Sequence, residues 1–82
     1  DAVVFGPDGT ALMILECKAE HVPLSQATLE QAVRYYSALH PRYLMLYNGT
    51  ECYCFQSDNG TLTALDHLPS YQEMTTKNDR RP

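Results

Sequence analysis

One arrangement of segments limits the folds open to this chain more than any other: a helical pattern stands between two apolar strand patterns. Residues 12–18 and 42–47 are apolar runs of strand length. Between them, apolar residues recur at helical spacing over residues 26–39, Ser25 is a good N-cap, and Pro41 ends the pattern. A strand, a helix and a strand in this order predict a right-handed parallel crossover and therefore an α/β fold.

Turn-forming residues divide the rest of the chain into antiparallel hairpins. Residues 6–10 (Gly-Pro-Asp-Gly-Thr) separate a β-branched run from the first apolar strand, and Asn48-Gly49 is a strong hairpin signal before residues 51–56. A further edge strand is expected at residues 61–65. The predicted fold is a mixed β-sheet built from a β-hairpin, one crossover helix and a second β-hairpin.

The 82 residues suffice for one small domain. We expect the ordered core to cover residues 1–65, and residues 66–82 to form a tail with a brief helical turn and a disordered end. The chain has no initiator Met and starts inside a predicted strand, so we expect it to be a segment of a longer protein.

Composition excludes several classes of function. No apolar run approaches the roughly 20 residues of a membrane-spanning helix, and no signal-peptide pattern is present. We therefore expect a cytoplasmic protein without a membrane partner. The net charge of −4 argues against a nucleic-acid binder that acts alone. Either bound metal and other domains supply phosphate binding, or nucleic acid is not the ligand.

The cysteine count of three is odd, and we expect reduced thiols. Cys17, Cys52 and Cys54 are predicted to pack in strands as small apolar side chains. A zinc site is the minor alternative, because it would need His21 or His67 at spacings that match no standard zinc pattern.

The first apolar strand ends in charged side chains, Glu16 and Lys18, which share one face of the strand. Burying a carboxylate and an ammonium costs free energy unless they have partners or a task. A hairpin loop of about four residues would bring a third charged residue, Asp1, opposite this pair. The expected cross-strand pairs are Phe5–Leu12, Val3–Ile14 and Asp1–Glu16.

Two directly opposed carboxylates repel each other, and a divalent cation between them would reverse the sign of that interaction. Asp1 and Glu16 therefore predict a site for Mg²⁺ or Mn²⁺, with the backbone carbonyl of Cys17 as an additional oxygen ligand. Lys18 could orient the attacking water or stabilise charge on phosphorus. The alternative is a surface ion pair of Glu16 and Lys18 on an edge strand.

A second pair of polar residues lies on the predicted helix. Gln31 and Tyr35 are one turn apart and point the same way, on the flank of the apolar stripe. Gln31 could contact a metal-bound water or a phosphate, and Tyr35 a phosphate or a base. The alternative is a solvated Gln and a half-buried Tyr on an amphipathic helix.

Taken together, these motifs resemble the amino-terminal nuclease domain of type I restriction enzyme R subunits, a branch of the PD-(D/E)xK nuclease superfamily. The resemblance covers about residues 1–56 and lies in the order of the motifs. They are residues 1–5 (DAVVF), residues 14–19 (ILECKA), Gln31-x-x-x-Tyr35 and residues 43–49 (YLMLYNG).

The resemblance implies the activity of a type I site-specific deoxyribonuclease, a Mg²⁺-dependent endonuclease core that hydrolyses DNA phosphodiesters. Asp1 matches the first acidic residue of the superfamily, Glu16 and Lys18 match the (D/E)xK pair, and Gln31 with Tyr35 matches the Q-x-x-x-Y helix motif. Implied partners are double-stranded DNA and the specificity and modification subunits of the restriction complex. ATP would act only through other domains.

The chain departs from this family in one respect, because a helix and a strand usually precede the first acidic residue and nothing precedes Asp1 here. We expect a domain truncated at its N-terminus, which alone cleaves little or no DNA. A non-catalytic scaffold or interaction module that retains the nuclease fold is the alternative. An exposed sheet edge would also favour a homo-oligomer of the fragment.

Overall fold

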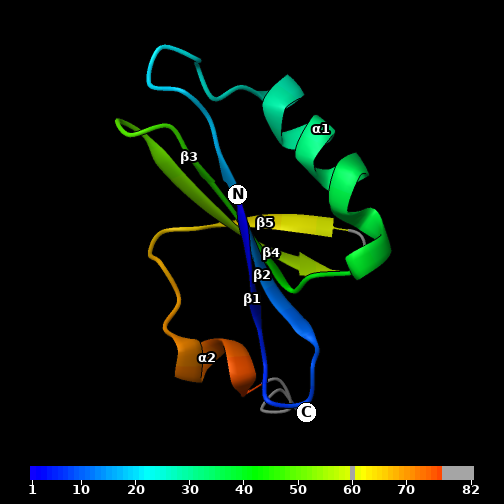
Figure 1. The fold of residues 1–82 in the computed structure, drawn as a ribbon. Coiled ribbons are helices and arrows are strands. Elements are labelled where there is room, and N and C mark those ends of the chain that lie inside the picture. Colours follow the sequence, from blue (N-terminus) through cyan, green and yellow to red (C-terminus); the bar gives the residue numbers. More distant parts are fainter. Residues whose placement is uncertain (60, 77–82) are drawn as a thin grey trace.

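The computed structural model describes residues 1–59 and 61–76, which form one mixed sheet with a helix against each face (Figure 1). Over these residues the five strands lie in the sheet in chain order. The elements are β1 (Ala2–Phe5), β2 (Ala11–Cys17), α1 (Gln26–Tyr36), η1 (Ser37–Leu39), β3 (Tyr43–Tyr47), β4 (Cys52–Asp58), β5 (Thr61–Leu65) and α2 (Tyr71–Thr75).

The predicted crossover is confirmed. β2 and β3 pair in parallel and are joined through α1, whereas the other neighbouring strands pair antiparallel. The prediction of an α/β fold with a mixed sheet is therefore correct. The carboxyl ends of β2 and β3 meet at one edge of the sheet, which is where sites gather in open sheets of this kind.

The first hairpin has a tighter loop than predicted. The backbone N–H of Gly6 donates to the carbonyl of Thr10 at 2.8 Å, so only residues 7–9 lie in the loop. Phe5 consequently pairs with Ala11, and its predicted pairing with the next residue of β2 is wrong. A Gly-Pro-Asp-Gly run can close this three-residue loop as a type I turn followed by a left-handed glycine, which is a common hairpin loop.

A β-bulge in the same hairpin restores the predicted register. Val4 pairs with Met13, so Leu12 opposes no residue of β1, and the predicted pair of Val3 with Ile14 is confirmed. The bulge also changes the face to which Leu12 belongs. Leu12 packs with Met13 in the core cluster of the α2 face, although simple alternation placed it with Ile14.

Helix α1 begins at a side-chain cap and ends in a tighter turn. Ser25 and Thr28 form a capping box in which each side chain bonds the backbone N–H of the other residue, at 3.3 Å in both directions. The predicted helix over residues 26–39 is α-helical to Tyr36 and continues as η1. His40 then takes a left-handed φ of 48°, which ends the helical segment. Only the side of α1 that faces the sheet is buried.

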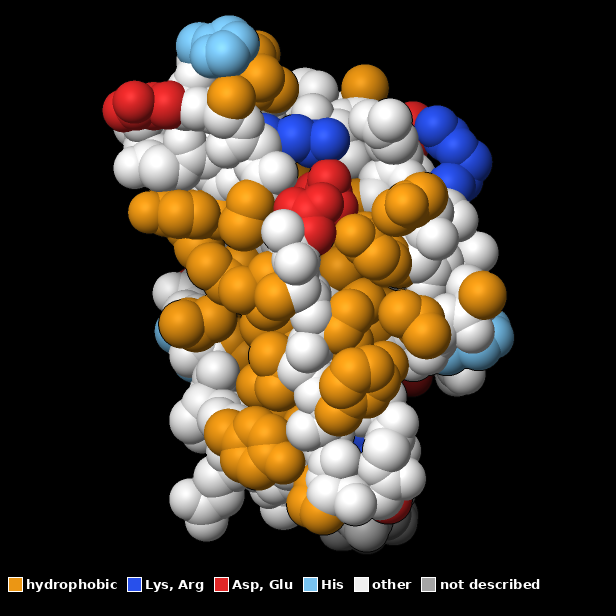
Figure 2. Space-filling model, in the orientation of Figure 1, with side chains coloured by type: hydrophobic (Ala, Val, Ile, Leu, Met, Phe, Trp, Pro, Cys, Tyr) orange, Lys and Arg blue, Asp and Glu red, His pale blue; other side chains and the backbone are white. Residues whose placement is uncertain are grey.

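Two apolar clusters form the core, one on each face of the sheet. Buried residues between the sheet and α1 are Ile14, Leu29, Ala32, Leu44 and Leu46. Those between the sheet and α2 are Leu12, Met13, Tyr43 and Met74. Hydrophobic side chains also cover much of the surface around β1, as Figure 2 shows. None of the helices in the described ranges is long and apolar enough to cross a membrane.

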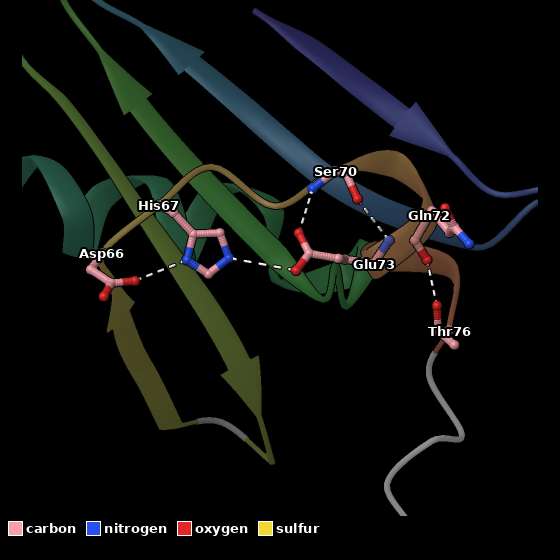
Figure 3. A network of polar contacts seen from close by, with 6 residues as sticks. All are labelled: Asp66, His67, Ser70, Gln72, Glu73 and Thr76. Atoms are coloured by element: carbon pink, nitrogen blue, oxygen red, sulfur yellow. Dashed lines mark hydrogen bonds and ion pairs between the residues drawn. The ribbon is translucent and has the colours of Figure 1, made fainter.

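The helical turn predicted for the tail is present as α2, and the predicted disordered end lies at residues 77–82, outside the described residues. A polar network holds the start of this helix (Figure 3). Ser70 and Glu73 form a capping box, with the Ser70 N–H donating to Glu73 Oε1 at 2.8 Å. The His67 ring bridges the carboxylates of Asp66, at 2.9 Å, and Glu73, at 3.7 Å.

This network predicts a small pH dependence of stability. The hydrogen bond with Asp66 raises the pKa of His67 above its ordinary 6.5, and the same bond lowers the pKa of Asp66 below 3.8. The N–H of Ser70 lowers the pKa of Glu73 below 4.5. The carboxylates stabilise the fold above their ordinary pKa values, and His67 stabilises it fully only below 6.5, so the stabilisation is greatest between about pH 4.5 and 6.5.

The measurement is the urea midpoint of the wild-type chain relative to His67→Gln. The wild-type advantage should be small, because these groups are exposed, and larger at about pH 5.5 than at about pH 8. An advantage that grows toward pH 8 would contradict the assignment.

Candidate functional site

Glu16 is a buried charged side chain at the carboxyl end of β2. It is 8% exposed, and its backbone pairs with Leu46 in the parallel ladder between β2 and β3. The Lys18 ammonium lies 3.1 Å from Glu16 Oε2. Desolvation opposes such a pair, so it adds little net stability, but removing either partner leaves the other charge uncompensated.

The backbone of Lys18 is fixed by the sheet, and its side chain is partly exposed. Its N–H donates to the carbonyl of Tyr47 at 2.8 Å, which extends the pairing with β3 one residue beyond β2. The Lys18 side chain is 28% exposed, compared with 11% for that of Glu16. The Lys18 side chain is therefore partly accessible to a ligand from solvent while it is paired with Glu16.

Asp1 lies directly across from Glu16. The observed pairs of Val3 with Ile14 and Ala2 with Leu15 place Asp1 opposite Glu16 one step further along. The Asp1 carboxylate accepts a hydrogen bond from the Cys17 N–H at 2.9 Å. Residues opposed in this way have Cβ atoms about 5 Å apart, and the Asp1 carboxylate bonds the backbone of β2 one residue beyond Glu16.

The Cys17 backbone completes this end of the sheet. The N–H and C=O of one residue in a strand point to the same side, so the Cys17 carbonyl points toward β1, as its N–H does. The structure thus places Asp1 beside the backbone of Cys17, and Lys18 beside Glu16, at the same end of β2. Figure 2 shows acidic side chains at the upper end of the apolar surface, with a basic side chain just above them.

The two predicted helix residues lie away from this group. Gln31 and Tyr35 are exposed, and Tyr35 is 77% exposed. The inward side of α1 instead carries Leu29, Ala32 and the partly buried Tyr36. Positions 31 and 35 each precede an inward position by one residue, which is a rotation of about 100° around the helix.

Two residues near the site were not singled out from the sequence. Burial raises the pKa of Tyr36 above its ordinary 10.0, and the Glu16 carboxylate raises it further through its charge and a hydrogen bond. The sequence did contain a signal for Tyr36. It is the polar-tipped residue on the apolar stripe of the helix that follows the strand carrying Glu16.

Asn48 is the second of these residues, and it is 5% exposed. Its Nδ2 donates to the Val22 carbonyl at 2.9 Å, and its Oδ1 accepts from the N–H groups of Thr50 and Glu51 at 2.9 and 2.7 Å. It thereby ties the turn after β3 to the loop that follows Lys18. The turn signal was evident in the sequence, but the long-range partner was not.

The donor set suits a hard cation. Across residues 1–59 and 61–76, no group of three or more His, Cys, Asp or Glu side chains is arranged to hold a metal ion, and Cys17, Cys52 and Cys54 are free thiols. This finding covers the zinc alternative and the Asp1–Glu16 pair alike, since neither supplies three such side chains in the described residues. Two carboxylates and a backbone carbonyl match Mg²⁺ or Mn²⁺ better, since such ions keep several waters and add substrate oxygens.

Comparison with known proteins gives one match. Residues 1–69 match the family model for the type I restriction enzyme R protein N terminus (HSDR_N). Neither a curated protein nor a solved structure matches the chain.

Proposed function

Because this chain belongs to the type I restriction enzyme R protein N-terminal family, we propose that Asp1, Glu16 and Lys18 form the hydrolytic centre of a Mg²⁺-dependent DNA endonuclease domain. The single observation that carries this proposal is the buried Glu16 carboxylate, paired with Lys18 at the carboxyl end of β2, where the Asp1 carboxylate bonds the neighbouring Cys17 N–H.

The proposed roles follow from the placement of each group. Asp1, Glu16 and the Cys17 carbonyl would hold the cation. A bound divalent cation supplies a water of lowered pKa and neutralises charge on the phosphate. Lys18 would donate to the attacking water or to the developing phosphorane oxygens once it leaves Glu16. Gln31 and Tyr35, exposed on α1, would contact the DNA backbone or a base outside the centre.

The same proposal names the partners and the setting. Double-stranded DNA is the substrate, and specificity and modification subunits are the protein partners of an R subunit that contains this domain. ATP would be used by other domains of that subunit. A cytoplasmic location follows from a role in restriction.

Manganese titration tests the proposed centre. The wild-type chain should bind Mn²⁺, and Glu16→Gln should weaken binding by more than about tenfold, or about 1.4 kcal/mol. Asp1→Asn should act in the same direction. Glu20→Gln is the control, since Glu20 is an exposed carboxylate near the site. Equal affinities in wild type and Glu16→Gln would reject the centre.

A scaffold function is the second candidate. It is favoured by the partners that both carboxylates already have within the protein, Lys18 for Glu16 and the Cys17 N–H for Asp1. A chain that binds no Mn²⁺, yet loses stability in Glu16→Gln, would support this role instead.

A further inference from the structure

Three sulfur-bearing side chains gather on the α2 face of the sheet, near the turn between β3 and β4. Cys54 pairs directly with Met45 across the antiparallel ladder, and Cys52 lies two residues before Cys54 on β4, on the same face. Met45 packs against the core cluster that contains Met13 and Tyr43, which identifies this face as the one that carries α2. Directly opposed residues have Cβ atoms about 5 Å apart, so the Met45 thioether lies beside Cys54.

The three sulfurs are reached from solvent through Cys52. The Cys52 side chain is exposed, Met45 is half-buried, and Cys54 is 7% exposed. Helix α2 packs through Met74 near the start of β3, which is the opposite end of this strand from the turn (Figure 1). An ion that binds the exposed Cys52 thiol is therefore next to the buried Cys54 thiol.

The spacing of the two thiols suits a metal ion and does not suit a disulfide. Residues two apart on a strand have Cβ atoms roughly 6.6 Å apart, whereas a disulfide needs about 3.8 Å. An ion with bonds of about 2.3 Å to each sulfur, the length found in zinc thiolates, spans sulfurs up to about 4.6 Å apart. Rotation about χ1 brings two sulfurs to that separation without movement of the strand. Both Cys52 and Cys54 are free thiols in the structure.

The donor set favours a soft ion. Structural zinc takes four ligands, and in the described ranges no group of three or more His, Cys, Asp or Glu is arranged to hold a metal ion. Cu(I) needs fewer ligands than zinc and accepts thiolate and thioether sulfur together. Burial raises the pKa of the Cys54 thiol above its ordinary 9.0, and the neighbouring Cys52 raises it further. Cu(I) therefore displaces a proton from Cys54 when it binds.

We propose that Cys52, Cys54 and Met45 form a binding site for Cu(I), with two thiolates and one thioether as ligands. Binding releases the protons of both thiols to solvent, and no electron is transferred. The site lies on the face of the sheet opposite to Glu16, whose partner Leu46 belongs to the core cluster under α1. It is independent of the proposed hydrolytic centre, whose oxygen ligands suit hard cations.

Competition with a coloured Cu(I) chelator, in anaerobic buffer with ascorbate, tests the site. The wild-type chain should bind a single Cu(I) ion, and Cys52→Ser should weaken binding by more than about tenfold. Because Cys52 is exposed, this variant removes a ligand without opening a cavity in the core. Cys17→Ser is the matched control, since Cys17 is an exposed thiol on the same face, separated from Cys52 by Tyr47. Equal affinities in wild type and Cys52→Ser, or an equal loss in Cys17→Ser, would overturn the proposal.

The methyl signals of the methionines locate the bound ion. In NMR spectra of a methyl-labelled chain, Cu(I) should shift the Met45 signal more than those of Met13 and Met74, which lie at the α2 end. Met45→Leu, which nearly keeps the side-chain volume, should weaken Cu(I) binding by a smaller factor than Cys52→Ser. Glu16→Gln should leave Cu(I) affinity unchanged, so the Cu(I) site and the hydrolytic centre are tested separately. A larger shift at Met13 or Met74, or no shift at Met45, would overturn the proposal.

Discussion

Lys18→Ala in the R subunit that carries this domain is expected to lower the rate of DNA cleavage by about 10²–10³-fold, the loss seen when one preorganised donor to a developing oxyanion is removed. The Lys18 ammonium sits 3.1 Å from Glu16 and remains partly exposed, so it can reach a phosphate beside the carboxylates. Because Lys18 is not proposed as a ligand, Mn²⁺ affinity should be retained. Lowered cleavage with retained Mn²⁺ affinity would show that Lys18 stabilises charge in the reaction and does not bind the cation.

The matching control is Arg34→Ala, which removes an exposed cation from α1 without touching the site. Plasmid cleavage by the assembled restriction complex is the measurement. Equal loss of cleavage in Lys18→Ala and Arg34→Ala would indicate a general effect of positive charge on DNA binding. Unchanged cleavage in Lys18→Ala would remove Lys18 from the mechanism.

Asn48→Ala is expected to lower the free energy of unfolding by about 2–4 kcal/mol, because it leaves three backbone groups without their partner at a buried position. The groups are the Val22 carbonyl and the N–H groups of Thr50 and Glu51. Urea unfolding measures the change. Gln26→Ala is the control, since that exposed side chain makes one long hydrogen bond of 3.4 Å, and it should shift stability by less than about 0.5 kcal/mol.

Loss of Asn48 should also loosen the end of β2 that carries Glu16 and Lys18. Asn48 holds the segment between Lys18 and α1 through Val22, and Val22 in turn donates its N–H to the Ala19 carbonyl at 2.9 Å. A loosened segment would let the end of β2 fray at the residue that carries the ammonium. A destabilisation below about 0.5 kcal/mol would show that the loop and turn are held by other contacts.

The order of the elements could be predicted from local patterns. Apolar runs of strand length around one capped amphipathic segment leave few topologies other than a parallel crossover. The predicted register that sets Asp1 against Glu16 assumed a four-residue loop and no bulge. The loop is one residue shorter than expected, and Leu12 bulges out of the ladder. These two shifts cancel, so the register beyond the bulge is the predicted one.

Two features depend on geometry that a linear pattern does not contain. Tyr35 and Tyr36 are adjacent in the sequence, and the rotation of α1 on the sheet decides which one packs against the core. That rotation is set by the packing of Leu29 and Ala32 against the sheet. The sequence pattern identifies Asn48 as a turn residue only. Its hydrogen bond to Val22 joins residues 26 positions apart, which no local pattern indicates.

The location of a bound Mn²⁺ ion tests the central claim most directly. In an NMR spectrum of the chain, substoichiometric Mn²⁺ should broaden the backbone amide signals of residues 2 and 16–18 first, because the ion would sit between the Asp1 and Glu16 carboxylates. Glu16→Gln should abolish this pattern. Broadening centred on other carboxylates, such as those near α2, or no broadening at all, would contradict the assignment of this end of the sheet as a metal-dependent hydrolytic centre.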